Sequence, residues 1–236
     1  MKNSKLIIIS LGGSVIVPHL SDEGGINILF LKKFRKLILE KLKRDKKFII
    51  VAGGGKTTRM YQKAATNITN IKKEDIDWIG IHATRLNAHL LRTIFQKEAY
   101  PVILDNPKKI LQKNKKNLMI AAGWRPGWST DYISVLLARR FKVKEVINAG
   151  DVSFVYKRDP KKFKNARPIQ KISWSDYQKL IPEEWTPGMS APFDPIATKL
   201  ARKLKLKVKI VKATDLKNLE NAIEEKKFKG TVIEGD

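Results

Sequence analysis

Two runs of β-branched residues, each ending in glycines, constrain the fold of this chain more than any other feature. Lys5–Leu11 (KLIIISL) leads into Gly12–Ser14, and Phe48–Ala52 (FIIVA) leads into Gly53–Gly55. Continuous apolar runs of this kind are typical of strands that are buried on both faces of a parallel sheet. We therefore expect each strand to end in a tight turn whose backbone N–H groups can approach an anion closely.

The second turn, GGGKTT, has the composition of a P-loop but not its spacing. A P-loop requires a glycine five residues before the glycine of Gly55-Lys56-Thr57, and Ile50 stands at that position. The spacing excludes a P-loop and leaves a strand, a glycine turn and a helix that begins near Thr57. This arrangement also holds phosphate, through backbone N–H groups and the positive end of the helix.

Strands and helices alternate along the rest of the chain. This alternation predicts an α/β fold with a mainly parallel sheet and helices on both of its faces. Further strands are expected at Pro101–Leu104, Leu118–Ala122, Glu145–Ala149, Val208–Val211 and Thr231–Ile233, with a turn or hairpin at Phe154–Tyr156. Helices are expected at Asn27–Lys43, Thr57–Thr66, Asp77–Phe95 and Thr130–Phe141, and after caps at Ser173, Asp194 and Thr214.

The chemistry-bearing residues gather after the strands, where ligands bind in parallel sheets. A third loop, Gly123–Asp131, offers the Ser129 and Thr130 hydroxyl groups at a helix N-terminus. Asp131 either complements the helix dipole or orients a lysine or a metal-bound nucleotide, and both alternatives stay open. Arg59 either grips phosphate or is a solvated helix residue. Two glycine turns and this loop together indicate a phosphoryl-transfer site.

The composition limits the other classes of function. The chain has 236 residues, 42% of them hydrophobic, which suits one α/β domain of two lobes or two small domains. It has no cysteine, so disulfides and thiolate metal sites are excluded, and three histidines leave little for a zinc site. No apolar run reaches the roughly 18 residues of a membrane span. We expect a cytoplasmic protein without a membrane partner.

The net charge of +25 admits two interpretations. The first is a nucleic acid or another polyanion as partner. The second is a lysine-rich solvated surface around a site for anionic substrates. The basic residues are spread along the whole chain, without an arginine-rich tail or an aromatic-interleaved strand motif. We therefore favour the second interpretation and expect no nucleic-acid partner.

Taken together, the motifs resemble those of the amino-acid kinase family and, within it, the archaeal-type uridylate (UMP) kinases. The most specific block is Asp77–Ala88 (DWIGIHATRLNA), and the isolated glycines are the least specific part. Order and spacing match over nearly the full length. The other carrying residues are Leu11–Val15, Gly53–Lys56 with Arg59 and Tyr61, Pro126–Asp131, Val155-Tyr156 with Asp159-Pro160, and Asp194-Pro195 with Ala197.

The resemblance implies a three-layer α/β/α sandwich, residues 1–236 as one domain, and transfer of the ATP γ-phosphoryl group to UMP with Mg²⁺. Residues 1–142 would bind the acceptor and residues 143–236 would bind ATP. ATP would contact Gly12, Gly13, Ser14, Gly55, Arg59, Gly150, Tyr156 and Asp159, whereas UMP would contact Gly54, Asp77, Trp124, Arg125, Pro126, Gly127, Trp128, Ser129 and Thr130. Arg59, Lys56, Asp131 and Asp151 are the candidate catalytic residues, and no protein ligand of a metal is assigned.

Several positions depart from the family pattern. Many members of the wider family carry a lysine where this chain has Ser10, and Lys56 is our hypothesis for the missing charge. Trp124 and Trp128 stand where small or polar residues are usual, and Phe154 replaces a glycine of the nucleotide loop. Asp151 resembles the acetylglutamate-kinase branch, where an aspartate organises catalytic lysines; capping of a turn is the other interpretation.

The family assembles as hexamers built from dimers, which predicts a homo-oligomer here.

Three alternatives for the function follow from these departures. The chain is a UMP kinase, a family member that phosphorylates another small phosphate or a carboxylate, or a basic nucleotide or nucleic-acid binder without activity. The segment Ser173–Phe193 is read as an ordered lid or a packed surface loop. We favour the UMP kinase because motifs for both substrates are present.

Overall fold

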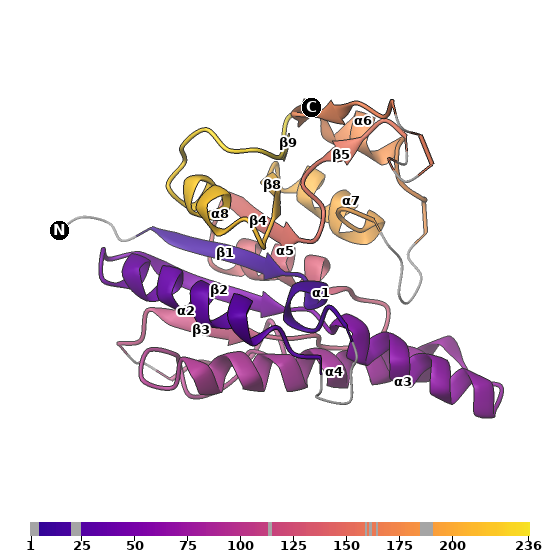
Figure 1. Cartoon of the computed structure of the whole chain (residues 1–236), viewed down its shortest axis with the longest axis horizontal. Helices are drawn as coiled ribbons and strands as arrows, with labels where there is room; N and C mark the ends of the chain where they lie inside the picture. The colour runs from indigo at the N-terminus through magenta and orange to yellow at the C-terminus, as the bar shows by residue number, and fades with distance from the viewer. Residues whose placement is uncertain are drawn as a thin grey trace.

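The computed structural model describes residues 5–19, 25–112, 115–158, 160, 162–163, 165–184 and 191–236. Seven strands within these ranges form one sheet, in the order β3-β2-β1-β4-β8-β9-β7 (Figure 1). Neighbours from β3 to β8 pair in parallel, β9 pairs antiparallel with β8, and β7 pairs in parallel with β9. The strands are β1 (Leu6–Leu11), β2 (Lys47–Ala52), β3 (Leu118–Ala121), β4 (Glu145–Gly150), β7 (Lys171–Ile172), β8 (Lys207–Lys212) and β9 (Thr231–Ile233).

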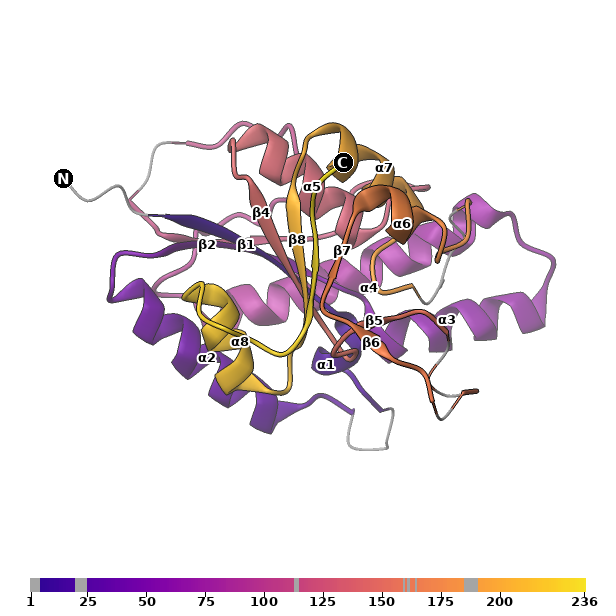
Figure 2. The same cartoon turned by 90° about the horizontal axis from the view of Figure 1, so that it is seen from above.

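Helices cover both faces of this sheet, which confirms the three-layer α/β/α sandwich. Figure 2 shows α2 and α8 on one side of the strands and α5 and α7 on the other. The first face carries α1 (Gly13–Ile16), α2 (Ile28–Leu42), α4 (Lys73–Ile94) and α8 (Leu216–Ile223). The second carries α5 (Thr130–Arg140), α6 (Trp174–Gln178) and α7 (Pro195–Lys203).

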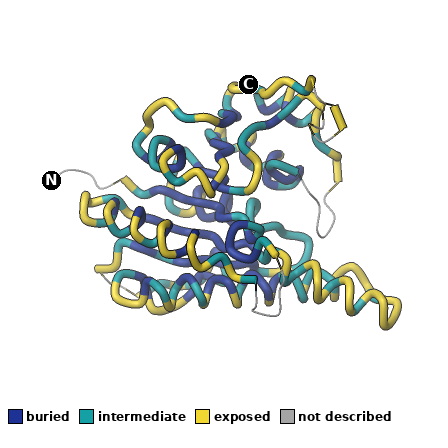
Figure 3. The backbone as a smooth tube through the Cα atoms, viewed as in Figure 1, coloured by how far each residue is buried: buried dark blue, intermediate teal, exposed yellow. Residues whose placement is uncertain are grey.

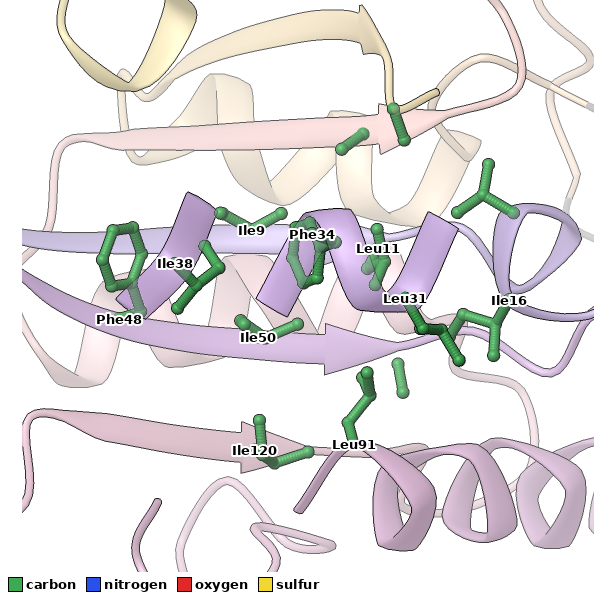
Figure 4. Close-up of a cluster of buried hydrophobic side chains, with 14 of the residues drawn as sticks. Ile9, Leu11, Ile16, Leu31, Phe34, Ile38, Phe48, Ile50, Leu91 and Ile120 are labelled. Atoms are coloured by element: carbon green, nitrogen blue, oxygen red, sulfur yellow. The ribbon is translucent and has the colours of Figure 1, made fainter. Parts of the chain in front are cut away.

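Two hydrophobic cores result, because successive side chains of a strand point to opposite faces. Ile9 and Leu11 of β1 pack with Phe34 of α2 in the first core (Figure 4). Ile8, which directly precedes Ile9, packs in the second core with Leu137 of α5. Burial on both faces is the physical reason for the unbroken apolar runs, and it fixes the central strands as a rigid base for the turns at their carboxyl ends.

One helix lies outside both cores. α3 (Gly55–Ile68) has no buried residue, and in Figures 1 and 3 its far end extends beyond the sheet as an exposed rod beside the start of α4. Its first residue directly follows the second glycine turn. The helix is therefore held at its N-terminal end, and this end is the one that faces the site.

Most of the expected elements are confirmed, and the differences have local causes. The strand at Pro101–Leu104 is wrong: Leu104 forms only an isolated bridge with Ala121, since proline has no N–H for a strand ladder. The cap of α8 is Asp215 instead of Thr214. α3 begins at Gly55 and α4 at Lys73, each earlier than expected. β5 (Val155–Tyr156) pairs with β6 (Pro168–Ile169), which confirms the hairpin.

Candidate active site

The two glycine turns are in direct backbone contact. A Cβ placed on Gly13 would lie 2.0 Å from the backbone N of Gly55, and one placed on Gly53 would lie 2.4 Å from the backbone N of Gly13. No real side chain fits at such distances. Glycine is therefore required at positions 13 and 53, because the backbones of the two turns approach each other so closely. The two turns, which the sequence predicts as separate features, form one junction.

The end of a third strand joins this junction. The N–H of Gly12 donates to the carbonyl of Ala149 over 2.8 Å, and a Cβ on Gly12 would lie 3.1 Å from the Cα of Gly150. The N–H of Gly53 donates to the carbonyl of Leu11 over 2.9 Å. These bonds bring the carboxyl ends of β1, β2 and β4 together. The junction therefore contains Gly12, Gly13, Gly53–Gly55 and Gly150.

The backbone at the start of α3 has the shape of an anion cradle. Gly54 lies in the right-handed helical region (φ −84°, ψ −27°), and Gly55 has φ +69°, which a side chain would strain. Successive residues of opposite hand turn consecutive N–H groups towards one concavity. The N–H groups of Gly54 and Gly55 donate to no group in the described part of the chain, whereas that of Lys56 donates to the carbonyl of Val17.

The loop between β3 and α5 lies against α4, which holds it at three points. The Thr84 hydroxyl accepts the N–H of Gly123 over 2.8 Å, and Arg85 donates to the carbonyl of Trp124 over 3.1 Å. Asp77 Oδ2 accepts the N–H of Gly127 over 2.7 Å. The half-buried Asp77 carboxyl has a raised pKa because burial disfavours its charge, and the Gly127 N–H opposes that rise.

Aromatic rings and one cation form the outer part of this loop. The rings of Trp124 and Trp128 meet edge to face at 4.9 Å, and Trp128 meets Tyr132 of α5 in the same way at 4.8 Å. The exposed Arg125 guanidinium lies 4.0 Å from the centre of the Trp128 ring. Such contacts fix the rings relative to each other. The two tryptophans that depart from the family pattern therefore pack on one another within the loop.

Comparison with known proteins identifies this arrangement. The sequence model of the amino acid kinase family matches residues 5–212. The chain belongs to the amino acid kinase family. This finding confirms the resemblance that the motifs indicate.

Relatives of this amino acid kinase match it over almost its whole length. Uridylate kinase of Thermococcus kodakarensis is 34% identical over 230 residues, which cover 97% of this chain and 99% of the relative. Uridylate kinase of Thermoplasma volcanium is 34% identical, with 97% of each chain covered. The crystal structure of uridylate kinase from Archaeoglobus fulgidus gives a TM-score of 0.76 at 29% identity, covering 96% of this chain and 99% of that one.

Two carboxylates, Asp131 and Asp194, lie beside the glycine junction of this amino acid kinase. Among the described residues, the side chains that donate to Asp131 are neutral. Asp131 Oδ1 accepts bonds from the hydroxyl of Ser10 and from Nδ2 of Asn148, each over 3.0 Å. Ser10 is the position at which the wider family often has a lysine, so a neutral donor replaces a cation here. Burial and, to a lesser degree, the charge of Asp194 together raise the pKa of Asp131 to about 7.

Asp194 connects this pair to the acceptor loop. It is buried, and its Oδ1 caps α7 by accepting the N–H groups of Ile196 and Ala197 over 2.7 and 2.8 Å. Its Oδ2 accepts the hydroxyl of Ser129, which in turn caps α5 through the N–H of Tyr132. Burial raises the pKa of Asp194 as well. The Ser129 hydroxyl is therefore already engaged within the protein.

The remaining candidates are placed as follows. Lys56 and Arg59 are exposed at the start of α3, and because the helix begins at Gly55, Arg59 lies one turn beyond that glycine. Asp151 is exposed directly after β4, Tyr156 lies on β5 with its ring 6.3 Å from that of Phe154, and Asp159 is outside the described residues. Ser14 lies in α1 directly after Gly13, Pro126 lies in the loop between β3 and α5, and Thr130 is the first residue of α5. The ligand contacts of all these residues stay predictions.

Sequence reasoning missed the side chains that hold the loops in place. Asn148 and Asn87 carry no pattern of their own, and Ser10 was noted only for the absent lysine. Asp194 was assigned as a helix cap, which is confirmed, but its pairing with Asp131 was not foreseen. One feature offered a clue: each of these polar residues interrupts an apolar strand or the apolar face of a helix, and a buried polar group requires a partner.

Proposed function

We propose that this chain is a uridylate kinase, which transfers the γ-phosphoryl group of ATP to UMP and gives UDP and ADP in pyrimidine nucleotide synthesis. The observation that carries this proposal is the junction of two glycine turns beside a loop held by Asp77. Backbone contact between Gly13 and Gly55 brings two phosphate cradles within one site. A reaction that moves a phosphoryl group between two phosphates needs both cradles at this separation.

In this function, the protein works by positioning and by neutralising charge, since phosphoryl transfer needs little covalent chemistry from side chains. The N–H groups around Gly12, Gly13, Ser14 and Gly55 hold the ATP phosphates. The exposed Lys56 and Arg59 lie at the same end of α3 and balance the negative charge. Gly150, Tyr156 and Asp159 line the adenosine side, and Asp151 supports the turn after β4.

The acceptor binds between the junction and the loop Trp124–Thr130. Gly54 supplies an N–H to the acceptor phosphate. One oxygen of Asp77 holds Gly127, and the other binds a ribose hydroxyl group. The Trp124 and Trp128 rings are fixed by their edge-to-face packing and offer a face for the pyrimidine base. Arg125 adds positive charge at the rim, and Pro126 and Gly127 shape the turn.

Mg²⁺ in this reaction comes with ATP. The described residues contain no group of three or more histidine, aspartate or glutamate side chains that is able to hold a metal ion. Mg²⁺ usually keeps several waters and relies on substrate phosphates as well as one or two carboxylates. We therefore assign no protein ligand to Mg²⁺, which would be held through the ATP phosphates and water and would neutralise phosphate charge there.

The assignment of lobes follows from the same proposal. Residues 1–142 contain the Asp77 and Trp124–Thr130 acceptor groups, and residues 143–236 contain Gly150 and Tyr156. The two halves share one sheet, because β1 pairs with both β2 and β4. A homo-oligomer is proposed from the family resemblance. None of the helices in the described ranges combines the length and apolar character that a membrane crossing requires.

The test is a turnover assay of the purified protein with ATP, Mg²⁺ and one acceptor at a time. The acceptors are UMP, CMP, dUMP, isopentenyl phosphate and N-acetylglutamate, and release of ADP is measured. We expect UMP to be preferred by at least about tenfold in kcat/KM. Gly13→Ala is the matched inactive control, because its Cβ has no space beside Gly55. Preference for another acceptor, or no turnover at all, would overturn the proposal.

A further inference from the structure

A buried asparagine of α4 binds the second glycine turn from below. Asn87 is 4% exposed, and its Nδ2 donates to the carbonyl oxygens of Gly53 and Gly54 over 2.8 and 3.1 Å. Both partners are acceptors, so the amide nitrogen is the side-chain atom that must face them. A single side chain therefore holds two consecutive peptide carbonyls of the turn.

Holding these carbonyls determines where the next two N–H groups point. The peptide bonds here are trans, and in a planar trans peptide the C=O and the following N–H point in opposite directions. The carbonyls of Gly53 and Gly54 point towards α4. The N–H groups of Gly54 and Gly55 therefore point away from α4, and they are the two that donate to no described group.

The glycines of the turn do not enforce this orientation by themselves. Glycine accepts backbone conformations of either hand, so a peptide plane between two glycines rotates at little cost. Gly13 packs against the carbonyl carbon of Gly54 and the nitrogen of Gly55, the two atoms that form one peptide bond. That contact limits the space around the peptide plane but does not distinguish the two directions of its C=O. The bonds from Asn87 do distinguish them.

We propose that Asn87 is a positioning residue of the phosphoryl-transfer site, which aims the N–H groups of Gly54 and Gly55 at the phosphates. This inference rests on the proposed kinase function and assigns a role to a residue outside the predicted site. Asn87 touches neither substrate. It acts through the turn, and on the proposed assignment Gly54 serves the acceptor and Gly55 serves ATP. Asn87 thus orients one donor for each reacting phosphate.

The experiment compares Asn87→Leu and Asn87→Asp with the wild-type chain. Both variants lose the side-chain N–H donors, and Asn87→Asp keeps the shape. Removing one preorganised donor from a transition state typically lowers kcat by about 100- to 1000-fold, and here the donors are misaimed rather than absent. We expect kcat to fall at least about 30-fold, and the KM for ATP to rise as well because its phosphates lose aimed N–H donors.

Asn218→Asp is the matched control for a purely structural effect. Asn218 of α8 is 7% exposed, its Nδ2 donates to the carbonyl of Lys229 over 2.7 Å, and it is not among the residues assigned to either substrate. It therefore loses the same kind of buried bond. We expect a similar drop in melting temperature for Asn218→Asp and Asn87→Asp, and an unchanged kcat for Asn218→Asp alone. Equal kcat in the two variants at matched stability would overturn the proposal.

A second readout separates this inference from the proposed function. Inorganic triphosphate is titrated into each variant by calorimetry, which requires no acceptor and no turnover. We expect its affinity to fall at least tenfold in both Asn87 variants and to stay constant in Asn218→Asp. If the wild type fails to phosphorylate UMP but this pattern holds, the kinase assignment fails and the role of Asn87 stands. Unchanged triphosphate affinity in the Asn87 variants would overturn that role.

Discussion

Two clusters of buried charge lie on opposite faces of the sheet, and they are built on opposite rules. Between α2 and α8, the fully buried Lys41 bonds Glu220 over 2.8 Å and Glu224 over 2.9 Å. Between α5 and α7, the carboxylates of Asp131 and Asp194 lie together, and the side-chain donors that bond them within the described residues are neutral. The first cluster pairs unlike charges far from the site, whereas the second brings like charges together beside it.

The pKa directions follow from this difference. The bond from Lys41 lowers the pKa of Glu220 to about 2, while burial and the neighbouring carboxylate raise that of Asp131. A group with a lowered acidic pKa stabilises the folded chain at neutral pH, and one with a raised acidic pKa costs stability there. We therefore propose that the α2–α8 cluster serves the fold, whereas the Asp131–Asp194 pair serves the reaction.

The largest effect is expected when the cation of the first cluster is removed. Lys41→Met removes the buried cation and leaves Glu220 and Glu224 with only the more exposed Lys217 and Lys46 as partners. Breaking a buried pair costs about 3 to 5 kcal/mol, and because both glutamates are about a quarter exposed we expect about 2 to 3 kcal/mol. Urea denaturation measures this loss, and turnover below the unfolding range should match wild type. A loss under about 1 kcal/mol would remove the stabilising half of the comparison.

A substitution in the second cluster is expected to raise the free energy of unfolding instead of lowering it. Asp131→Asn removes one of the two like charges, and its Oδ1 can still accept from Ser10 and Asn148. We expect the variant to be about 1 kcal/mol more stable at pH 8, and to phosphorylate UMP at least about tenfold more slowly. Denaturation and the turnover assay give the two values. A variant that is more stable and fully active would show that the pair has no role in the reaction.

The two clusters should also respond to pH in different ranges. Asp131 has a folded pKa of about 7 above its ordinary value of 3.8, so its proton is held more tightly in the folded state. Its contribution to stability is therefore greatest at low pH and declines as pH rises from about 4 to about 7. Glu220 has a folded pKa of about 2 below its ordinary 4.5, so its contribution is lost as pH falls through that range.

Unfolding free energies measured from pH 3 to pH 8 check this expectation. The difference between wild type and Asp131→Asn should change mainly between about pH 4 and 7, and the difference between wild type and Lys41→Met mainly below about pH 4.5. If both differences changed over the same pH range, the pKa values of Asp131 and Glu220 would not be shifted in opposite directions, and the comparison of the two clusters would be contradicted.

The smallest effect is expected at an exposed pair of unlike charges. Lys5 and Glu225 form an ion pair with about half of each side chain exposed. Water and salt screen such pairs, so we expect Lys5→Ala to cost less than about 0.5 kcal/mol. Thermal melts at low and high salt give the measurement. A cost equal to that of Lys41→Met would mean that burial is not what separates strong from weak pairs in this chain.

Most of the strands and helices could be predicted from local sequence patterns. β1, β2 and their glycine turns were predictable because β-branched runs and glycines act through neighbouring residues. The same reasoning failed at Pro101–Leu104, where a short apolar run mimics a strand. Lys41 stands seven residues after Phe34, so it falls on the buried stripe of α2, yet nothing nearby revealed its partners.

The geometry of the site was less predictable because its contacts are remote in sequence. Asp131 had two open interpretations, and the bond that narrows them comes from Ser10, 121 residues away. Asn87 reaches Gly53 across 34 positions. The chemistry-bearing segments could be located from strand ends, but the bonds between them depend on how the sheet brings distant turns together.

The glycine junction also links catalysis to the order in which the chain folds. Neither turn forms the junction alone, because Gly13 and Gly55 follow two paired strands that are separated in sequence by α1 and α2. A refolding chain should therefore recover its secondary structure before any phosphate affinity, and binding should return together with the pairing of β1 and β2. The rate at which phosphate binding recovers during refolding should therefore report the rate at which the centre of the sheet assembles.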